Sequence, residues 1–145
     1  MSFVGNALTD AFKLALLEGR YDFRPGGSVF KLALYTKSAA LNAQTSLYTA
    51  SGEVDPSGTY VTGGLILTPS TPQVISGVAL VTFQNLSITG ASFSARGALI
   101  YESSSLGSVA VLDFGADKVA TPAAPFVVRF GPPGSQAPIQ LAGST

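Results

Sequence analysis

The sequence predicts a mainly β protein, an antiparallel β-sandwich of jelly-roll type with one N-terminal α-helix. Three observations support this fold class. Apolar residues recur at helical spacing only near the start of the chain. From residue 28 onward they occur in short runs separated by Gly, Pro, Asn or Ser, a pattern typical of sandwiches and barrels. The runs follow one another too closely for crossover helices, so the sheets are expected to be largely antiparallel.

The chain length fits one domain. A chain of 145 residues buries roughly two thirds of its unfolded surface, which suffices for one core. No shift in composition marks an internal boundary. Residues 1–145 are therefore expected to form a single domain, with the helix over about 5–18 and the sandwich over about 28–142.

The predicted helix is amphipathic and unusually apolar. Its main stripe consists of Val4, Leu8, Ala11, Phe12, Ala15 and Leu16. Asn6 is the expected N-cap, and Gly19 can end the helix. Leu14 and Leu17 widen the apolar arc beyond one face, so the helix is expected either to pack on its own sheet or to dock on a partner.

The first predicted strand is the run SVFKLALYT, in which Phe30, Leu32 and Leu34 share one face. Residues 36–62 are mostly small and polar and are expected to form a long excursion with a helical turn near SAALNAQ. Later strands are expected in the runs GLILT, QVISG, VALVTFQ, SITGASFSARGALIY, SVAVLDFG, PFVVRFG and PIQLAG. The proline-containing segments 121–125 and 131–138 are expected to be loops, because Pro cannot donate to a ladder.

The predicted hairpin GALIYESSSLGSVAVLDFG carries two carboxylates among apolar residues. With a four-residue loop, Glu102 lies opposite Val109, and Ala98 lies opposite Asp113. The two carboxylates are then four residues apart along the ladder, about 13 Å at ~3.3 Å per residue. Paired glycosidase carboxylates lie only about 5–9.5 Å apart. Glu102 and Asp113 are therefore not predicted to be a catalytic pair.

Both faces of this hairpin are apolar in the predicted register. One face carries Ala98, Ile100, Val109 and Val111, and the other carries Leu99, Tyr101, Ala110 and Leu112. A single core covers one face of a sheet. A second layer is therefore expected, supplied either by the same chain or by a neighbouring copy.

Asp113 and Asp117 flank a glycine in the segment LDFGADK. They are expected to accept N–H bonds from a turn or to pair with Arg96 or Lys118. This structural role is favoured over calcium binding, because no dense loop of oxygen ligands surrounds them.

The composition removes several kinds of chemistry. The chain has no His, Cys or Trp, so zinc, haem and iron–sulfur sites lose their usual ligands, and Ser–His or Cys–His nucleophiles cannot form. No phosphate loop or dinucleotide motif is complete. A Ser–Lys pair stays open, although no spacing indicates one. No enzyme activity, catalytic residue, metal site or cofactor is predicted.

Charge is scarce and evenly divided. Charged residues make up 11% of the chain, hydrophobic residues 46%, and the net charge is zero. Scattered single cations argue against a nucleic-acid partner, and no apolar run is long enough to span a membrane. Asp10 and Lys13 interrupt the N-terminal apolar run, so no signal peptide is predicted.

The low charge itself indicates that a partner covers part of the surface, because interface cores are depleted of Lys and Glu. The alternative is a small β protein that Ser, Thr and Gly keep soluble without charge.

Several segments together resemble small virion proteins of tailed bacteriophages, in particular the capsid cement or decoration proteins. The series is LLEGRYDF, FKLALYT, SLYTASGEVDPSGTYVTGG, ARGALIY and VLDFGADK. The resemblance spans nearly the whole chain, from Leu16 to about Phe130. Its most specific pieces are Gly52-Glu53-Val54 with Gly58, Tyr60, Gly63 and Gly64, then Ala95-Arg96-Gly97-Ala98, then Leu112-Asp113-Phe114-Gly115. The segment 69–83 and the proline-rich tail fit this pattern less well, so contacts there are expected to be particular to this phage.

The resemblance implies a structural protein of the virion. It would be made in the host cytoplasm, bind the major capsid protein on the outside of an icosahedral head, and bridge neighbouring subunits. A tail, neck or fibre component is the nearest alternative. A carbohydrate-binding β-sandwich is another, in which exposed aromatics would stack on sugars: Tyr35, Tyr48, Tyr60 and Tyr101.

Self-association is also expected, most simply as a twofold homodimer. The candidate residues for contacts with a second copy or with the capsid are Phe12, Leu16, Leu17 and Tyr101. Leu17 lies off the main helical stripe. Its replacement by Lys is therefore expected to leave the fold intact and to weaken assembly.

Overall fold

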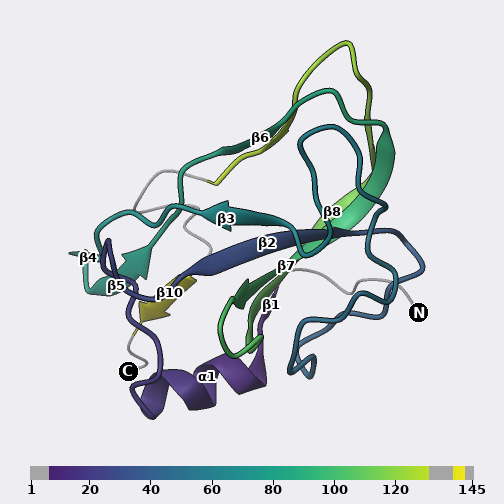
Figure 1. Ribbon diagram of the computed structural model, residues 1–145. Coiled ribbons are helices and arrows are strands. Elements are labelled where there is room, and N and C mark those ends of the chain that lie inside the picture. Colours follow the sequence, from purple (N-terminus) through teal and green to yellow (C-terminus); the bar gives the residue numbers. More distant parts are fainter. Residues whose placement is uncertain (1–6, 131–138, 143–145) are drawn as a thin grey trace.

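The computed structural model describes residues 7–130 and 139–142 and is mainly β, with one short helix (Figure 1). The helix α1 spans Asp10–Leu17. The strands are β1 Ala7–Leu8, β2 Phe30–Tyr35, β3 Leu65–Leu67, β4 Gln73–Ile75, β5 Val78–Val81, β6 Leu86–Ile88, β7 Phe93–Glu102, β8 Ser108–Ala120, β9 Phe126–Val128 and β10 Ile139–Ala142. Every pairing between these strands is antiparallel, as the sequence predicts.

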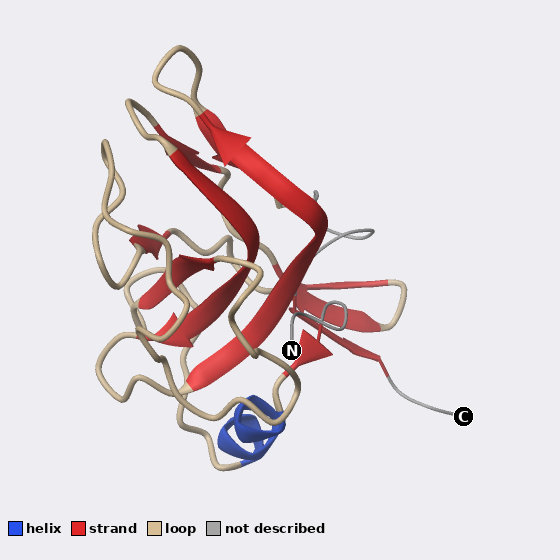
Figure 2. Cartoon of the chain, turned by 90° about the vertical axis from the view of Figure 1, so that its right-hand side faces the viewer, coloured by secondary structure: helices blue, strands red, loops and turns tan. Residues whose placement is uncertain are grey.

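The described strands form three sheets. The largest has the order β1-β8-β7-β2-β3, a second has the order β10-β5-β4, and β6 pairs with β9. The two longest strands, β7 and β8, form a bent ribbon that reaches beyond the rest of the large sheet (Figure 2). The bend coincides with a bulge. Between the pairs Gly97–Asp113 and Ala95–Lys118, β7 advances two residues while β8 advances five.

The helix is shorter than the predicted span 5–18. Residues 7 and 8 instead form β1, which pairs with β8. Thr9 is the N-cap: its hydroxyl accepts the N–H of Phe12 at 3.2 Å, and Asp10 follows in the first turn. The predicted N-cap was therefore wrong. Asn6 itself, like Val4, lies outside the described residues.

Gly19 ends the helix, as predicted. It has a φ of +69° and donates its N–H to the carbonyl of Leu16, while the N–H of Arg20 bonds to the carbonyl of Ala15. This is the Schellman arrangement, and glycine adopts its left-handed conformation without steric cost. One face of the helix packs on the protein through Phe12, which stacks on Tyr21 with ring centroids 6.0 Å apart.

The β7–β8 hairpin forms, but its predicted register was wrong by one residue. Ile100 lies opposite Ala110 rather than Val111, because an irregularity follows at Tyr101, which lies opposite Ser108. A one-residue shift moves side chains to the other face of a strand. Val111 therefore joins Leu99 and Tyr101, whereas Ala110 joins Ala98 and Ile100.

The second layer of the hairpin comes from the same chain. One face of the large sheet contributes to the main core, which includes Phe12, Phe30, Leu34 and Ile100. The other face is covered by the excursion between β2 and β3, and the second core consists of Ala33, Tyr35, Ala39, Leu41, Leu99, Tyr101 and Val111, with Tyr48 packed against it. The described part of the excursion contains hydrogen-bonded turns rather than the predicted helical turn. The apolar second face therefore does not by itself require a neighbouring copy.

Residues 68–84 form one long, interrupted hairpin. β4 and β5 pair at its tip, around a turn at Ser76 and Gly77. Nearer its base, the N–H of Ser70 bonds to the carbonyl of Thr82, and the N–H of Gln84 bonds to the carbonyl of Thr68. The segment 65–75 thus changes partners, because β3 pairs with β2 at the end of the large sheet, whereas residues 68–75 pair with residues 78–84.

Candidate interaction surface

The four residues predicted for interfaces do not share a surface. Phe12 is 0% exposed and Tyr101 is 3% exposed, so the protein's own interior already buries both side chains. Leu16 is partly buried against the main core. Of the four residues, only Leu17 is largely exposed to solvent, with 88% of its surface accessible. Phe12 and Tyr101 are thus not available to a partner in this structure, and Leu17 remains a candidate.

A cluster of tyrosines around Glu53 connects the excursion to the large sheet. The hydroxyl of Tyr48 donates to Glu53 Oε1 at 2.5 Å, and the hydroxyl of Tyr60 donates to Glu53 Oε2 at 2.6 Å. The N–H of Gly63 also donates to Oε2, at 2.8 Å. We call these residues, with Tyr35 and Tyr101, the Glu53 cluster. Three donors thus satisfy one carboxylate, and hydrogen bonds to a charged acceptor are the stronger kind.

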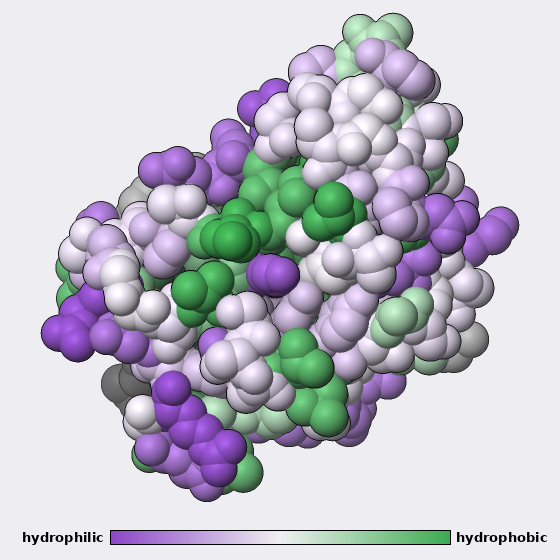
Figure 3. Space-filling view, in the orientation of Figure 1, coloured by the Kyte–Doolittle hydropathy of each residue, from purple (hydrophilic) through white to green (hydrophobic). Residues whose placement is uncertain are grey.

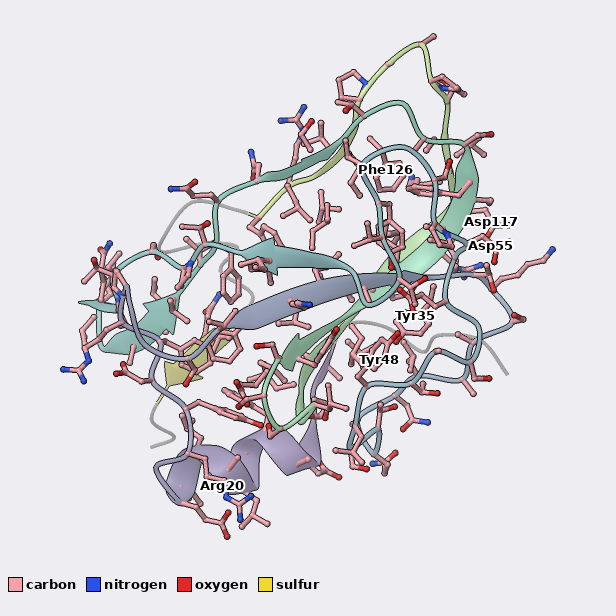
Figure 4. All side chains as sticks on the ribbon, viewed as in Figure 1. Arg20, Tyr35, Tyr48, Asp55, Asp117 and Phe126 are labelled. Carbon is pink, nitrogen blue, oxygen red and sulfur yellow. The ribbon has the colours of Figure 1, made fainter. Side chains whose placement is uncertain are left out.

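The same cluster reaches the backbone of the sheet. Tyr60 accepts the N–H of Leu34 at 2.9 Å, and Tyr101 donates to the carbonyl of Gly63. The ring of Tyr101 also stacks on that of Tyr48, with centroids 4.7 Å apart. Figure 4 shows the neighbouring side chains of Tyr35 and Tyr48 under one end of β2. The hydroxyl groups are therefore engaged within the chain.

The tyrosines of this cluster stay neutral. Burial, with the Glu53 carboxylate as a further cause, raises the pKa of Tyr35, Tyr48, Tyr60 and Tyr101 above the usual tyrosine value. A neutral hydroxyl is a donor, which suits a carboxylate acceptor. Tyr35 and Tyr60 are at most 1% exposed, so they offer no platform on which a sugar could stack.

Two glycines, Gly58 and Gly64, let the backbone of the excursion pass very close to the backbone of neighbouring segments. Gly64 has a φ of +88°, and a Cβ on it would lie 2.0 Å from the carbonyl oxygen of Leu32. Gly58 has a φ of +57°, and a Cβ there would lie 2.2 Å from the carbonyl oxygen of Thr89. No other residue fits such a position without moving the backbone. Glycine at these two positions thus has a structural reason.

The carboxylates of the β7–β8 hairpin are also structural. Glu102 accepts bonds from the backbone and hydroxyl groups of Ser104 and Ser105 in the loop. Asp113 accepts the N–H of Gly115 at 2.8 Å and lies 3.5 Å from Arg96 Nε, as predicted. Gly97 lies opposite Asp113, so Glu102 is five residues further along β7, about 16 Å away at ~3.3 Å per residue.

A hollow in the described structure lies between β8, β9 and β1. It has a volume of about 1090 Å³ and is open to solvent. Its wall includes the rings of Phe114, Phe126 and Phe130 and the cations Lys118 and Arg129. Figure 4 marks Phe126 at this end of the molecule. The lining mixes apolar rings with single charges and carries no pair of facing carboxylates.

With this geometry in view, the chain can be compared with known proteins. No family model, curated protein or solved structure matches it. Within the described residues, no three acidic side chains converge as metal ligands would. The one helix in that part of the chain is too short to cross a membrane.

Exposed apolar side chains are spread over several elements. Those more than half exposed are Leu14, Leu17, Leu47, Val61, Ile66, Val74 and Val119. Figure 3 shows hydrophobic residues gathered around the part of the surface where β2 and β3 run in Figure 1. Contact with another macromolecule at these positions would bury apolar area.

The Glu53 cluster was not predicted from the sequence. Glu53, Tyr48 and Tyr60 lie close in the sequence, but their partners Leu34 and Tyr101 are distant in it. The signal was present, because Glu53 stands between two tyrosines in a segment that is otherwise small and polar. This pattern predicts a cluster only if one already knows that the segment folds back over the sheet.

Proposed function

We propose that this chain is a non-enzymatic structural protein of a tailed-phage virion. In this role it is a cement or decoration protein that binds the major capsid protein on the outer surface of the head and stabilises contacts between capsid subunits. It also associates with further copies of itself. The host cytoplasm is its place of synthesis, and the capsid surface is its place of action.

The main support for the proposal is that the residues most specific to the resemblance with cement proteins hold the fold together. Glu53, Tyr60 and Gly64 are all engaged in holding the excursion on the sheet. Arg96 and Asp113 pair beside the bulge of the hairpin. The segments that resemble cement proteins thus specify a shape rather than a reactive centre, as a protein that works through buried contact area requires.

The surface chemistry also supports a contact role. Only 11% of the residues are charged, against about 25% in an average soluble domain. Several large apolar side chains are exposed at the same time. Many copies of such a protein gain avidity when several weak contacts close around one lattice point.

The jelly-roll topology belongs to this proposal. Antiparallel pairing and the non-local neighbours β1–β8 and β2–β7 are features that a jelly roll requires. The three described sheets give a β-sandwich-like structure, and an experimental structure of the whole chain tests the finer assignment.

Position on the virion separates this function from its alternatives. Purified particles of the phage that encodes the chain would be labelled with gold-conjugated antibody against it. The proposal predicts label spread over the head. Label confined to the tail, the neck or one vertex would overturn it and favour a tail, neck or fibre component.

A glycan array tests the carbohydrate-binding alternative. The proposal predicts no specific glycan binding, because Tyr35, Tyr60 and Tyr101 are buried. Strong binding to one glycan class, lost when a surface aromatic is replaced, would contradict the proposed function.

A further inference from the structure

The first part of the excursion lies against the large sheet without a helix or strand of its own. We call this part, residues 36–53, the strap, and all of its residues are described. It contains turns and isolated bridges, such as the one between Leu47 and Gly107. Figure 1 draws it as blue loops that follow β2. The order of the strap therefore depends on its contacts with the rest of the chain.

The strap buries few apolar side chains. Ala39 and Leu41 are buried in the second core, and Tyr48 is partly buried against it. Most other strap residues are Ser, Thr, Ala, Asn or Gln. Val54 and Tyr60, which follow the strap, belong to the main core instead. Since fixing each residue of a loop costs conformational entropy, a segment with so small a core is weakly held by apolar contacts alone.

Backbone hydrogen bonds attach the strap to its surroundings. The N–H of Tyr48 bonds to the carbonyl of Leu106, in the β7–β8 loop, at 2.8 Å. The N–H of Thr36, directly after β2, bonds to the carbonyl of Gly52 at 2.8 Å. Bonds between neutral groups contribute little net stability, because water replaces them when the segment detaches. They fix the position of the strap more than they hold it closed.

Glu53 fastens the end of the strap. It is the only charged residue between Lys37 and Asp55 in the sequence. Its Oε2 atom accepts the hydroxyl of Tyr60 at 2.6 Å and the N–H of Gly63 at 2.8 Å, and both donors lie outside the strap. Hydrogen bonds to an ionised acceptor are roughly twice as strong as neutral ones. Each of these bonds is therefore expected to hold the strap more strongly than a neutral backbone bond does.

We propose that the strap opens as one unit while the main core stays folded, and that the Glu53 carboxylate is the catch that limits this opening. Segments with few buried apolar contacts open at a lower free energy than core strands do. Opening uncovers an apolar face of the large sheet, which carries Ala33, Tyr35, Leu99, Tyr101 and Val111. This inference concerns the isolated chain and does not rest on the proposed function.

Native-state hydrogen exchange of the purified full chain, followed by NMR at low urea concentrations, tests this inference. The amides of Thr36 and Tyr48 report on the strap, and the slowest amides of β7 and β8 report on the main core. The two strap amides are expected to share one protection factor, at least tenfold below that of the core amides, and to depend less on urea. Strap amides as protected and as urea-dependent as the core amides would overturn the inference, because the strap would then open only when the whole protein unfolds. Two strap amides that open independently would overturn it as well.

Two substitutions separate the strap from the core. Glu53→Gln is expected to lower the protection of Thr36 and Tyr48 at least tenfold, because the charged acceptor is lost. Ile100→Val removes one methylene from the main-core face of β7, opposite to the face that the strap covers. It is expected to lower the protection of the core amides about fivefold and to leave that of the strap amides unchanged. An equal loss in both sets of amides in Ile100→Val would overturn the inference, because it would couple the strap to global unfolding.

Glu18→Gln is the matched control, since it makes the same chemical change in an exposed pair with Arg20 and should leave the strap amides unchanged. Circular dichroism spectra establish that each variant is folded. If Glu53→Gln does not fold, Tyr48→Phe replaces it, because it removes one donor to the carboxylate but keeps the ring that stacks on Tyr101. It is also expected to lower the protection of the strap. Strap protection that is unchanged in the Glu53 or Tyr48 variant, or lowered as much in Glu18→Gln, would overturn the role of Glu53 as the catch.

Discussion

The Glu53 cluster and the hairpin of residues 68–84 follow each other in the chain and have opposite surface properties. In the cluster, Tyr48, Tyr60 and Gly63 all donate to one carboxylate, and the residues are folded inward. At the tip of the hairpin, Val74 is 72% exposed and Ile75 is 37% exposed, and β4 is paired on one side only in the described structure. The cluster satisfies its polar groups within the chain, whereas the hairpin tip leaves apolar side chains in solvent.

This difference shows where function is to be sought in the molecule. The segments with the most specific residues hold the excursion on the sheet, and Gly64 marks the end of that region. The hairpin that follows, residues 68–84, carries no charged residue. Packing within the chain constrains the residues of the cluster, whereas it does not constrain the exposed residues at the hairpin tip.

The largest expected effect is at Gly64. Gly64→Ala places a Cβ against the carbonyl of Leu32 at a φ of +88°, and is expected to lower the free energy of unfolding by about 3 kcal/mol or more. Gly26→Ala is the matched control, because its φ is +84° and nothing lies within 4 Å. It should cost only about 1–2 kcal/mol. Equal losses in urea unfolding would contradict a packed excursion.

Glu53→Gln tests the centre of the cluster. The amide replaces one acceptor by a donor that faces a tyrosine hydroxyl, and we expect a loss of about 2 kcal/mol in the free energy of unfolding. Glu18→Gln removes a charge from an exposed pair with Arg20 and should cost less than about 1 kcal/mol. Urea unfolding checks both. A loss at Glu53 no larger than at Glu18 would show that the cluster contributes little.

Acid tests the hydrogen bonds of the hairpin loop. Burial alone would raise the pKa of Glu102, but bonds from Ser104 and Ser105 lower it below its usual 4.5. The folded state therefore favours the carboxylate, and its contribution is complete above the unfolded pKa and lost as the pH falls through the folded pKa. The stability difference between wild type and Glu102→Gln should shrink from pH 6 to about pH 3. A constant difference would contradict the role of these bonds.

The smallest expected effect is a gain at the tip of the uncharged hairpin. Ser76 has a φ of +51°, and Gly77 follows with a φ of +80°, as in a type I′ turn, where Asn-Gly is preferred. Ser76→Asn should raise the free energy of unfolding by about 0.5 kcal/mol. Thermal melts measure this gain. A destabilised variant would indicate a different turn.

The local features of the fold could be predicted from the sequence. Hydrophobic periodicity identified the centre of the helix and the strand Phe30–Tyr35, and Gly19 marked the helix end. The helix start was missed because Asn6 and Thr9 are both good N-caps. Only the pairing of Ala7 and Leu8 with β8 decides between them, and that contact joins residues about one hundred positions apart.

Hydrophobic periodicity could predict neither the strand register nor which apolar side chains are exposed. The irregularity between Ile100 and Tyr101 shifts β8 by one residue, and no local signal marks it. The predicted interface used apolarity alone, so it included Phe12 and Tyr101, which the chain itself covers. Exposure depends on what folds over a residue, and here that is a distant segment.

A cryo-EM reconstruction of the intact phage head tests the central claim most directly. Copies of this fold are expected on the outer surface of the capsid, with the Glu53 cluster internal to each copy. Heads that carry no such copies, or copies that contact the capsid through the side chains of the Glu53 cluster, would contradict it.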